Sequence, residues 1–156
     1  MTLPLGNREV QLLHLGRGNT AGDVVAFLPK EKILITGDLL VHPVPYSFGS
    51  FLSEWIATLK QMAAMQPAII IPGHGAAQHD QTYLTQVIGL LETTVKQVKD
   101  AAQRGLSLEE ARKAVDLEAF RLRFAGDDAA RNYAFQNYFF IPATERAYKE
   151  AKGEIK

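Results

Sequence analysis

The first half of the chain consists of short apolar runs separated by glycine, proline and polar residues. This pattern predicts four strands, over residues 9–15, 24–28, 33–36 and 68–71. Between the third and fourth strands, Phe51, Trp55, Leu59 and Met62 recur at helical spacing. They predict a helix that ends near residue 65, with Ser50 or Ser53 as its N-cap.

The second half has the longer apolar repeat that is typical of helices. A helix is predicted over residues 80–104, and Ser107 with Glu110 predicts a capping box that opens a short helix. Asp127 or Asp128 is expected to cap a last helix, which Pro142 interrupts. Its aromatic run, residues 133–140, is interpreted as packing that helix onto the core, although such a run is also suited to lining a pocket.

The order of these elements predicts the fold class. Strands, a helix, a further strand and then helices indicate an α/β (α+β) domain with a mixed sheet covered by helices on one face. We expect a single domain over residues 1–156, in which residues 1–79 are sheet-rich with one helix and residues 80–156 are helical.

Composition narrows the functional classes. Lys+Arg and Asp+Glu balance at 17 each, which gives no electrostatic reason to expect a nucleic acid or an anionic membrane as partner. The absence of cysteine excludes thiolate metal sites and cysteine nucleophiles. No apolar run approaches the roughly 20 residues that span a bilayer, and the N-terminus lacks signal-peptide features. We expect a cytoplasmic location for the chain as given, whereas a missing N-terminal segment would leave the location unknown.

Three predicted strands are each followed by a loop in which glycine flanks a polar residue. These loops are Gly18-Asn19-Thr20, Gly37-Asp38 and Gly73-His74-Gly75. Glycine lets the backbone turn sharply and leaves the polar side chain at the sheet edge, where sites of α/β proteins gather. A turn aspartate and a turn histidine are the alternative interpretations of Asp38 and His74. His14, by contrast, is interpreted as structural or surface.

Together these segments resemble the metallo-β-lactamase superfamily. The resemblance lies in the order, spacing and strand context of residues 13–25, 35–40 and 70–75, and it covers roughly residues 9 to 80. It implies the second half of an αββα sandwich that holds one or two zinc ions between its halves. By resemblance, Asp38 takes the place of a metal-bridging carboxylate with a catalytic role, and His74 takes that of the last histidine ligand.

The sequence departs from the family pattern in two ways. Asn19 stands where the family has a histidine ligand, and an amide oxygen binds zinc more weakly than imidazole does. Asn19 is therefore expected to bind metal weakly, to hold a metal-bound water or to shape its turn. The His-x-His-x-Asp-His motif of the first half is also missing. His42 and His79 are weak candidates for further ligands, because a solvated loop is the simpler interpretation of each.

If the site is completed, the resemblance implies metal-dependent hydrolysis of a small molecule, with Tyr46 and Phe48 on one wall of the substrate cleft. Three alternatives remain open for the chain itself. The first is an inactive second half that needs a missing N-terminal half. The second is a homodimer that completes itself with an interface metal site. The third is a non-catalytic binding or structural module that retains the fold. With so few ligands, the sequence does not decide whether the chain alone binds zinc, and therefore does not decide whether it is an enzyme.

Overall fold

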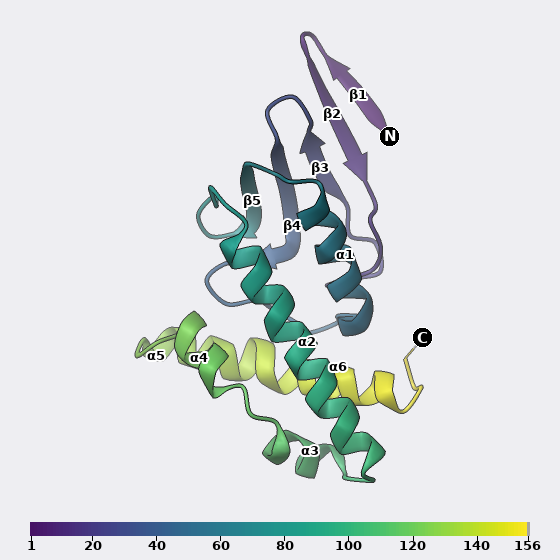
Figure 1. Cartoon of the computed structure of the whole chain (residues 1–156), viewed down its shortest axis with the longest axis vertical. Coiled ribbons are helices and arrows are strands. Elements are labelled where there is room, and N and C mark those ends of the chain that lie inside the picture. Colours follow the sequence, from purple (N-terminus) through teal and green to yellow (C-terminus); the bar gives the residue numbers. More distant parts are fainter. Residues whose placement is uncertain (156) are drawn as a thin grey trace.

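The computed structural model of the chain describes residues 1–155 and contains one five-stranded sheet (Figure 1). The strands follow the order of the chain across the sheet. They are β1 (Thr2–Leu5), β2 (Arg8–Leu13), β3 (Val25–Leu28), β4 (Ile33–Val41) and β5 (Ile69–His74). All neighbouring pairs are antiparallel except β4 and β5, which are parallel. The sheet is therefore mixed, as the sequence predicts, and β1 is a strand that the sequence pattern did not reveal.

The parallel pair β4 and β5 forms the edge of the sheet that carries two of the glycine-flanked loops. Leu34 and Ile70 face each other across this pair and are completely buried. The prediction that β4 ends at Thr36 is wrong, because the strand continues to Val41. It does so through register shifts that begin at Gly37, where φ is +55°, a conformation that favours glycine.

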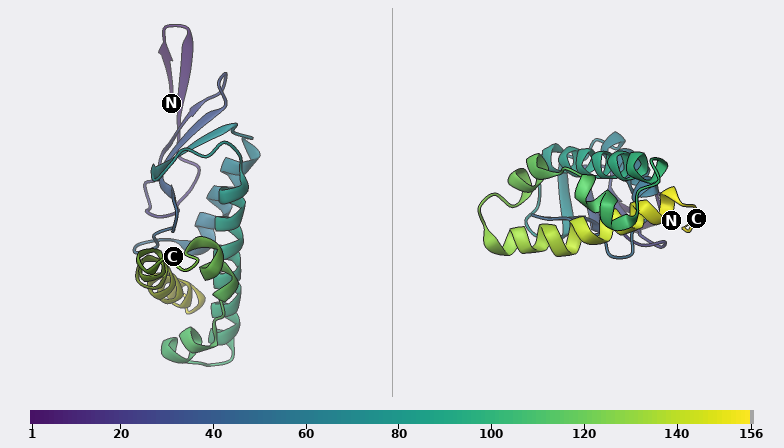
Figure 2. Two further views of the ribbon diagram at one scale, coloured as in Figure 1. Left: turned by 90° about the vertical axis from the view of Figure 1, so that its left-hand side faces the viewer. Right: turned by 90° about the horizontal axis from the view of Figure 1, so that it is seen from below.

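The helices form a layer on one face of the sheet and a cluster beyond one end of it. Their bounds are α1 (Leu52–Ala64), α2 (Thr82–Gln103), α3 (Leu108–Ala114), α4 (Glu118–Phe124), α5 (Ala129–Ala134), the π-helix η1 (Phe135–Phe140) and α6 (Ile141–Ala151). Helices α1 and α2 cover the sheet, and α2 extends past it to pack on α3 and α6 (Figure 2). None of the helices within residues 1–155 has the length and hydropathy needed to cross a bilayer.

The helix termini confirm some of the predicted caps and correct others. Ser107 and Glu110 form the predicted capping box, and the side chain of Asp128 caps α5. Neither Ser50 nor Ser53 caps α1, which begins after Phe51 without a side-chain cap. The hydroxyl groups of these serines instead donate to Ser47 and Glu150, respectively.

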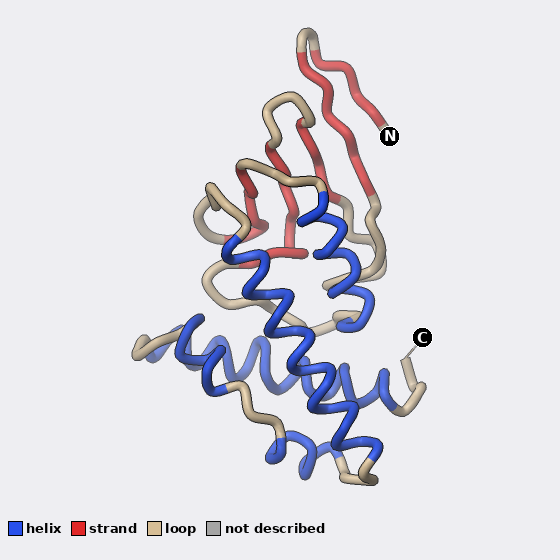
Figure 3. Tube along the Cα trace, viewed as in Figure 1, coloured by secondary structure: helices blue, strands red, loops and turns tan. Residues whose placement is uncertain are grey.

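Pro142 does not interrupt the last helix, contrary to the prediction. Helix α5, η1 and α6 form one continuous helical rod, with Pro142 in the first turn of α6 (Figure 3). Pro142 has no N–H to donate to the carbonyl oxygen of Tyr138, four residues earlier, and that oxygen instead accepts from the backbone N–H of Ser47 at 2.9 Å. The change to π-helical hydrogen bonding just before it supplies the transition that the sequence pattern did not reveal.

The face of the sheet opposite α1 and α2 is apolar, and no element within residues 1–155 covers it (Figure 2). Side chains alternate between the two faces of a strand, so the neighbours of the buried Leu34 and Ile70 point to this open face. Ile35 and Ile71 on this face are 39% and 38% exposed. The cross-strand register continues the apolar surface through Leu3, Val10, Leu12, Ala26, Leu28, Ile33 and Ile69.

Candidate metal centre

Asp38 and His74 lie side by side at one end of the parallel strands β4 and β5. The distance from Asp38 Oδ1 to His74 Nε2 is 3.5 Å. The pairing of Gly37 with Pro72 places the two residues next to each other, although they are far apart in sequence. Their side chains are 47% and 59% exposed, so both are accessible to an ion and a substrate. The structure thus brings together the two residues that the sequence singled out most strongly.

Glycine at position 73 makes this approach possible. A Cβ atom on Gly73 would lie 2.0 Å from Asp38 Oδ1 and 2.5 Å from the carbonyl carbon of Gly37. Both distances are far below van der Waals contact, so any side chain at position 73 would displace the carboxylate or the backbone beneath it. Gly73 therefore permits the contact between Asp38 and the loop of His74.

The two donor atoms are spaced as two ligands of one tetrahedral zinc ion would be. Zinc binds imidazole nitrogen and carboxylate oxygen at roughly 2.0–2.2 Å, which puts two tetrahedral donors about 3.4 Å apart. Among residues 1–155, however, no third His, Cys, Asp or Glu joins this pair in a metal-binding group. A structural or catalytic zinc site takes three or four protein ligands, so these residues fit half of a site and do not complete one.

His42 lies close to the pair but faces the protein interior. Its backbone N–H donates to the carbonyl oxygen of His74 at 3.1 Å, and its ring meets Tyr83 edge to face at 4.8 Å. Burial, with a smaller contribution from the positive charge of Arg131, lowers the pKa of His42. His42 is thus only partly solvated, and its ring packs the loop after β4 against α2.

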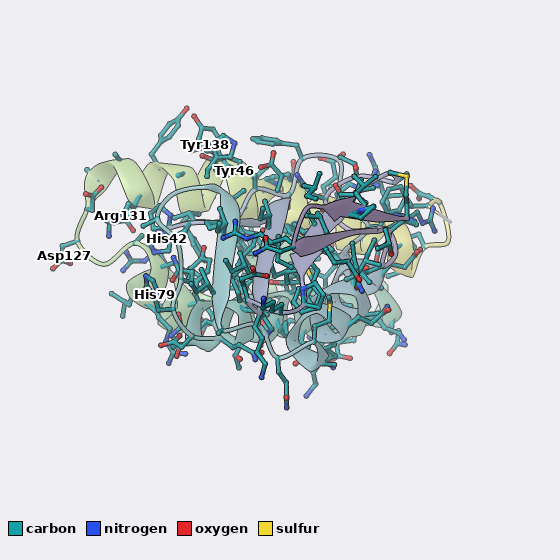
Figure 4. The ribbon with its side chains drawn as sticks, turned by 90° about the horizontal axis from the view of Figure 1, so that it is seen from above. His42, Tyr46, His79, Asp127, Arg131 and Tyr138 are labelled. Atoms are coloured by element: carbon teal, nitrogen blue, oxygen red, sulfur yellow. The ribbon has the colours of Figure 1, made fainter. Side chains whose placement is uncertain are left out.

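His79 is exposed in the loop that leads into α2, and among the described residues it adds no third ligand to the pair (Figure 4). Asn19 is half-buried in the loop between β2 and β3. Its φ is not positive, so the tolerance of asparagine for left-handed backbone does not explain its presence. The loop is instead closed by Asp23, which accepts hydrogen bonds from the backbone N–H and the hydroxyl of Thr20, both at 2.8 Å.

The loop after β4 is attached to the C-terminal helices by Ser47, a residue that the sequence did not single out. This buried serine donates from its backbone N–H to the carbonyl oxygen of Tyr138 and from its hydroxyl to that of Phe139, both at 2.9 Å. Both acceptors belong to the π-helix η1. Ser47 therefore fixes the position of its neighbours Tyr46 and Phe48 relative to the candidate site.

Tyr46 connects the candidate site with an exposed group of aromatic rings. Its ring centroid is 5.9 Å from that of His74 and 5.5 Å from that of Tyr138. Phe135 and Phe139 are buried, so the predicted packing role of the aromatic run holds for these two residues. It does not hold for Tyr133 and Tyr138, which are exposed.

The match to known proteins covers the strands and loops that build this site. The family model described as the metallo-beta-lactamase superfamily matches residues 3–74, from β1 to His74. By this match, residues 3–74 belong to the metallo-beta-lactamase superfamily. Asp38 and His74 both lie inside the matched region, whereas the helices from α2 onward lie outside it.

Two named relatives describe the extent of the similarity within the metallo-beta-lactamase superfamily. The metallo-beta-lactamase type 2 of Bacillus sp. (strain 170) is 28% identical over 96 residues, which are 58% of this chain and 37% of that protein. The metallo-beta-lactamase type 2 of Bacteroides fragilis is 31% identical over 81 residues, or 48% of this chain and 32% of that protein. The chain thus spans about a third of the length of the curated relatives it matches.

Solved structures extend the comparison to the whole fold. A metallo-beta-lactamase from Pontibacter korlensis superimposes with a TM-score of 0.53 and 26% identity over 59% of this chain and 45% of that one. A metallo-beta-lactamase family protein from Thermus thermophilus matches over 100% of this chain and 48% of its own length, with a TM-score of 0.64 and 16% identity. The second likeness is one of fold alone, and it includes the C-terminal helices. The α/β fold predicted from the sequence is therefore confirmed.

Proposed function

We propose that this chain is the C-terminal half of a metal-dependent hydrolase of the metallo-β-lactamase superfamily and is inactive until a second unit covers its open sheet face. The observation that carries the proposal is the spacing of 3.5 Å between Asp38 Oδ1 and His74 Nε2, which suits two ligands of one ion. Asp38 and His74 supply two of the ligands, and the second unit supplies the rest.

The open sheet face supports a covering unit. It is apolar across all five strands, and contiguous exposed apolar surface of this kind is typical of a surface that binds another protein unit. The Asp38–His74 pair lies at the end of the same sheet. A unit packed on the face would therefore reach the pair with its own loops and bring further ligands.

The residues of this chain have distinct roles in the completed site. Metal ions in hydrolases activate water and polarise the bond that is cleaved. Asp38 would hold the ion through its carboxylate, and His74 would hold it through Nε2. Tyr46 limits the movement of the His74 ring, because the two rings are in contact. With two ligands, the chain alone holds zinc too weakly for catalysis.

The covering unit is either an N-terminal half that carries the missing motif or a second copy of this chain. In a twofold homodimer, the same apolar face of each copy would pack on the other, and two Asp38–His74 pairs would provide four donors. The apolar character of the open face favours both arrangements over a chain that functions uncovered.

Zinc titration of the purified chain, with analytical ultracentrifugation, tests this proposal. We expect a monomer with weak zinc binding that Asp38→Ala and His74→Ala each abolish, and no hydrolysis with zinc added. His79→Ala is the matched control, because this exposed histidine is not part of the pair, and it should leave zinc binding unchanged. A dimer that binds one tight zinc per two chains would identify the second copy as the covering unit.

Two results would overturn the assignment. Zinc binding that survives both Asp38→Ala and His74→Ala would place the metal elsewhere. Hydrolysis by the zinc-loaded monomer would contradict the requirement for a covering unit. A chain that binds no zinc even when its open face is covered would be a non-catalytic module that retains the fold.

A further inference from the structure

A group of four aromatic rings, of which three are exposed and Tyr46 is partly buried, adjoins His74 and comes from two distant parts of the chain. Tyr46 and Phe48 belong to the loop after β4, and Tyr133 and Tyr138 belong to α5 and η1. Figure 4 shows Tyr46 and Tyr138 next to each other. We call these four residues the aromatic shelf. The family model ends at His74, so half of the shelf lies outside the region that defines the family.

The rings of the shelf form a continuous chain of contacts. Tyr138 is at its centre, with its ring centroid 5.5 Å from Tyr46, 5.6 Å from Phe48 and 5.8 Å from Tyr133. Phe48 and Tyr133 are both 60% exposed, and Tyr138 is 36% exposed. Aromatic side chains that are exposed as a group, and are not scattered singly, are typical of a binding surface.

The helical rod and the loop after β4 together hold the shelf. Tyr138 lies in η1, and Tyr133 lies five residues earlier, in α5. Their rings meet edge to face. Ser47 bonds to two carbonyl groups of η1 and so holds the loop of Tyr46 against it. π-Helical turns of this kind occur frequently at functional sites.

A hollow next to the shelf is large enough for part of a small ligand and has a positively charged side chain in its lining. Its volume is about 180 Å³, and its lining comprises Pro43, Val44, Tyr46, Ala130, Arg131 and Ala134. Ala130 and Ala134 are one turn apart in α5, and these small side chains line the hollow together with Tyr46, a ring of the shelf. Arg131 contributes a guanidinium, which lies 4.0 Å from the carboxylate of Asp128, with both side chains about half exposed.

We propose that the aromatic shelf and this hollow bind the aromatic part of an anionic substrate, with Arg131 attracting a carboxylate on it. An aromatic ring of the ligand stacks on Tyr46 and Tyr138. A carboxylate of the ligand that reaches the hollow is attracted by the positive charge of Arg131. The contact between Tyr46 and His74 places the bound ring next to the pair that the proposed hydrolysis uses. That the ligand is a substrate rests on the proposed function, whereas the binding itself requires neither metal nor turnover.

Three features favour a small ligand over a protein partner as the occupant. The shelf has a polar rim, because three of its four rings carry a hydroxyl group. The hollow has the size of a small ring and a charge at its wall. The shelf also contacts His74 through Tyr46, whereas the open sheet face offers an apolar surface that extends over all five strands and suits a protein.

NMR of the tyrosine ring signals in the full chain tests the proposal without metal. Phenylacetate, phenylacetamide and acetate serve as probes, because they separate the contribution of the ring from that of the charge. We expect phenylacetate to shift the signals of Tyr46 and Tyr138, phenylacetamide to bind more weakly and acetate to have no effect. Tyr138→Ala should raise the Kd of phenylacetate about fivefold through loss of stacking.

Two further variants make the outcome decisive. Arg131→Gln, at an exposed position of α5, should weaken phenylacetate to the level of phenylacetamide and leave phenylacetamide unchanged. Leu122→Ala is the control, because it removes a comparably exposed apolar side chain from α4 and should change neither affinity. Unfolding curves establish that each variant is folded.

The proposal is overturned if phenylacetate and acetate act alike, or if Tyr138→Ala binds phenylacetate as the wild type does. Its failure is separable from that of the proposed function. Zinc binding that depends on Asp38 with no phenylacetate binding would refute the shelf alone. Phenylacetate binding without zinc binding would instead refute the hydrolase and leave a ligand-binding module.

Discussion

The carboxylate of Asp38 occupies the space in which a side chain on Gly73 would have to lie. A Cβ atom at position 73 would be 2.0 Å from Asp38 Oδ1, so the two residues are mutually dependent. The position of the Asp38 carboxylate thus requires glycine at position 73, because any side chain there would displace it. His74, the next residue along β5, is thereby brought within 3.5 Å of the same carboxylate.

Gly73→Ala should consequently disrupt the Asp38–His74 pair and destabilise the fold. Forcing a methyl group into this contact is expected to cost about 1–3 kcal/mol in the free energy of unfolding. Urea unfolding measures this cost, and zinc titration measures the loss of the pair. Gly22→Ala is the matched control, because no atom lies within 4 Å of its added Cβ. If Gly73→Ala behaved like Gly22→Ala in both measurements, the required role of this glycine would be refuted.

Tyr83 supports the loop after β4 from beneath. Its hydroxyl donates to the carbonyl oxygen of Val41 at 2.5 Å, and its ring packs against His42. Burial raises the pKa of Tyr83 far above its usual value, so it stays a hydrogen-bond donor at any ordinary pH. Tyr83→Phe leaves the carbonyl group of Val41 buried without this donor and should lower the free energy of unfolding by roughly 1–3 kcal/mol.

Urea unfolding at neutral pH checks this cost. Tyr133→Phe is the control, because it removes the hydroxyl of a tyrosine that is 60% exposed and should change stability little. Equal effects of the two substitutions would show that the bond from Tyr83 to Val41 contributes nothing.

The capping box of α3 should give the stability of the chain a dependence on pH. Hydrogen bonds from the hydroxyl and the backbone N–H of Ser107 lower the pKa of Glu110. A carboxyl group with a lowered pKa stabilises the folded state above the unfolded pKa of about 4.3, and this contribution is lost as pH falls through the folded value. Glu110→Gln keeps an acceptor but removes the charge.

The difference in unfolding free energy between wild type and Glu110→Gln should therefore be constant from about pH 7 to about pH 5 and should shrink below that range. Urea unfolding over this pH series measures it. A difference that grew on acidification would contradict the assigned direction of the pKa shift.

The sequence singled out Asp38 and His74 because the signal for each is local, whereas their ligand roles came from the family resemblance. A buried strand followed by glycine and a polar residue is visible in a few positions, and the parallel pairing of β4 and β5 then brings the two ends together. The N-cap of α3 at Ser107 was predictable for the same reason, since the two residues of the capping box, Ser107 and Glu110, are three positions apart.

The features that the sequence did not reveal depend on contacts between distant segments. Ser47 acts through carbonyl groups of residues more than ninety positions away, and a lone serine in a loop gives no sign of this. The split of the aromatic run into buried phenylalanines and exposed tyrosines depends on which side of the helical rod faces the core, and that is decided by packing against distant segments. Residue type alone offered one hint, since tyrosine tolerates exposure better than phenylalanine does.

Ile70 and Ile71 provide a direct test of the open sheet face, because they are adjacent in β5 and point to opposite sides. Ile70 is completely buried under the helices, whereas Ile71 is 38% exposed on the open face. Ile70→Ala should cost about 2–5 kcal/mol in the free energy of unfolding, and Ile71→Ala clearly less. Ile71→Lys should also reduce the binding of the apolar dye ANS, since it places a charge in the uncovered apolar surface. Equal costs for Ile70→Ala and Ile71→Ala would mean that the face is already covered in solution, and a doubled mass of the wild type would then identify a second copy as the cover.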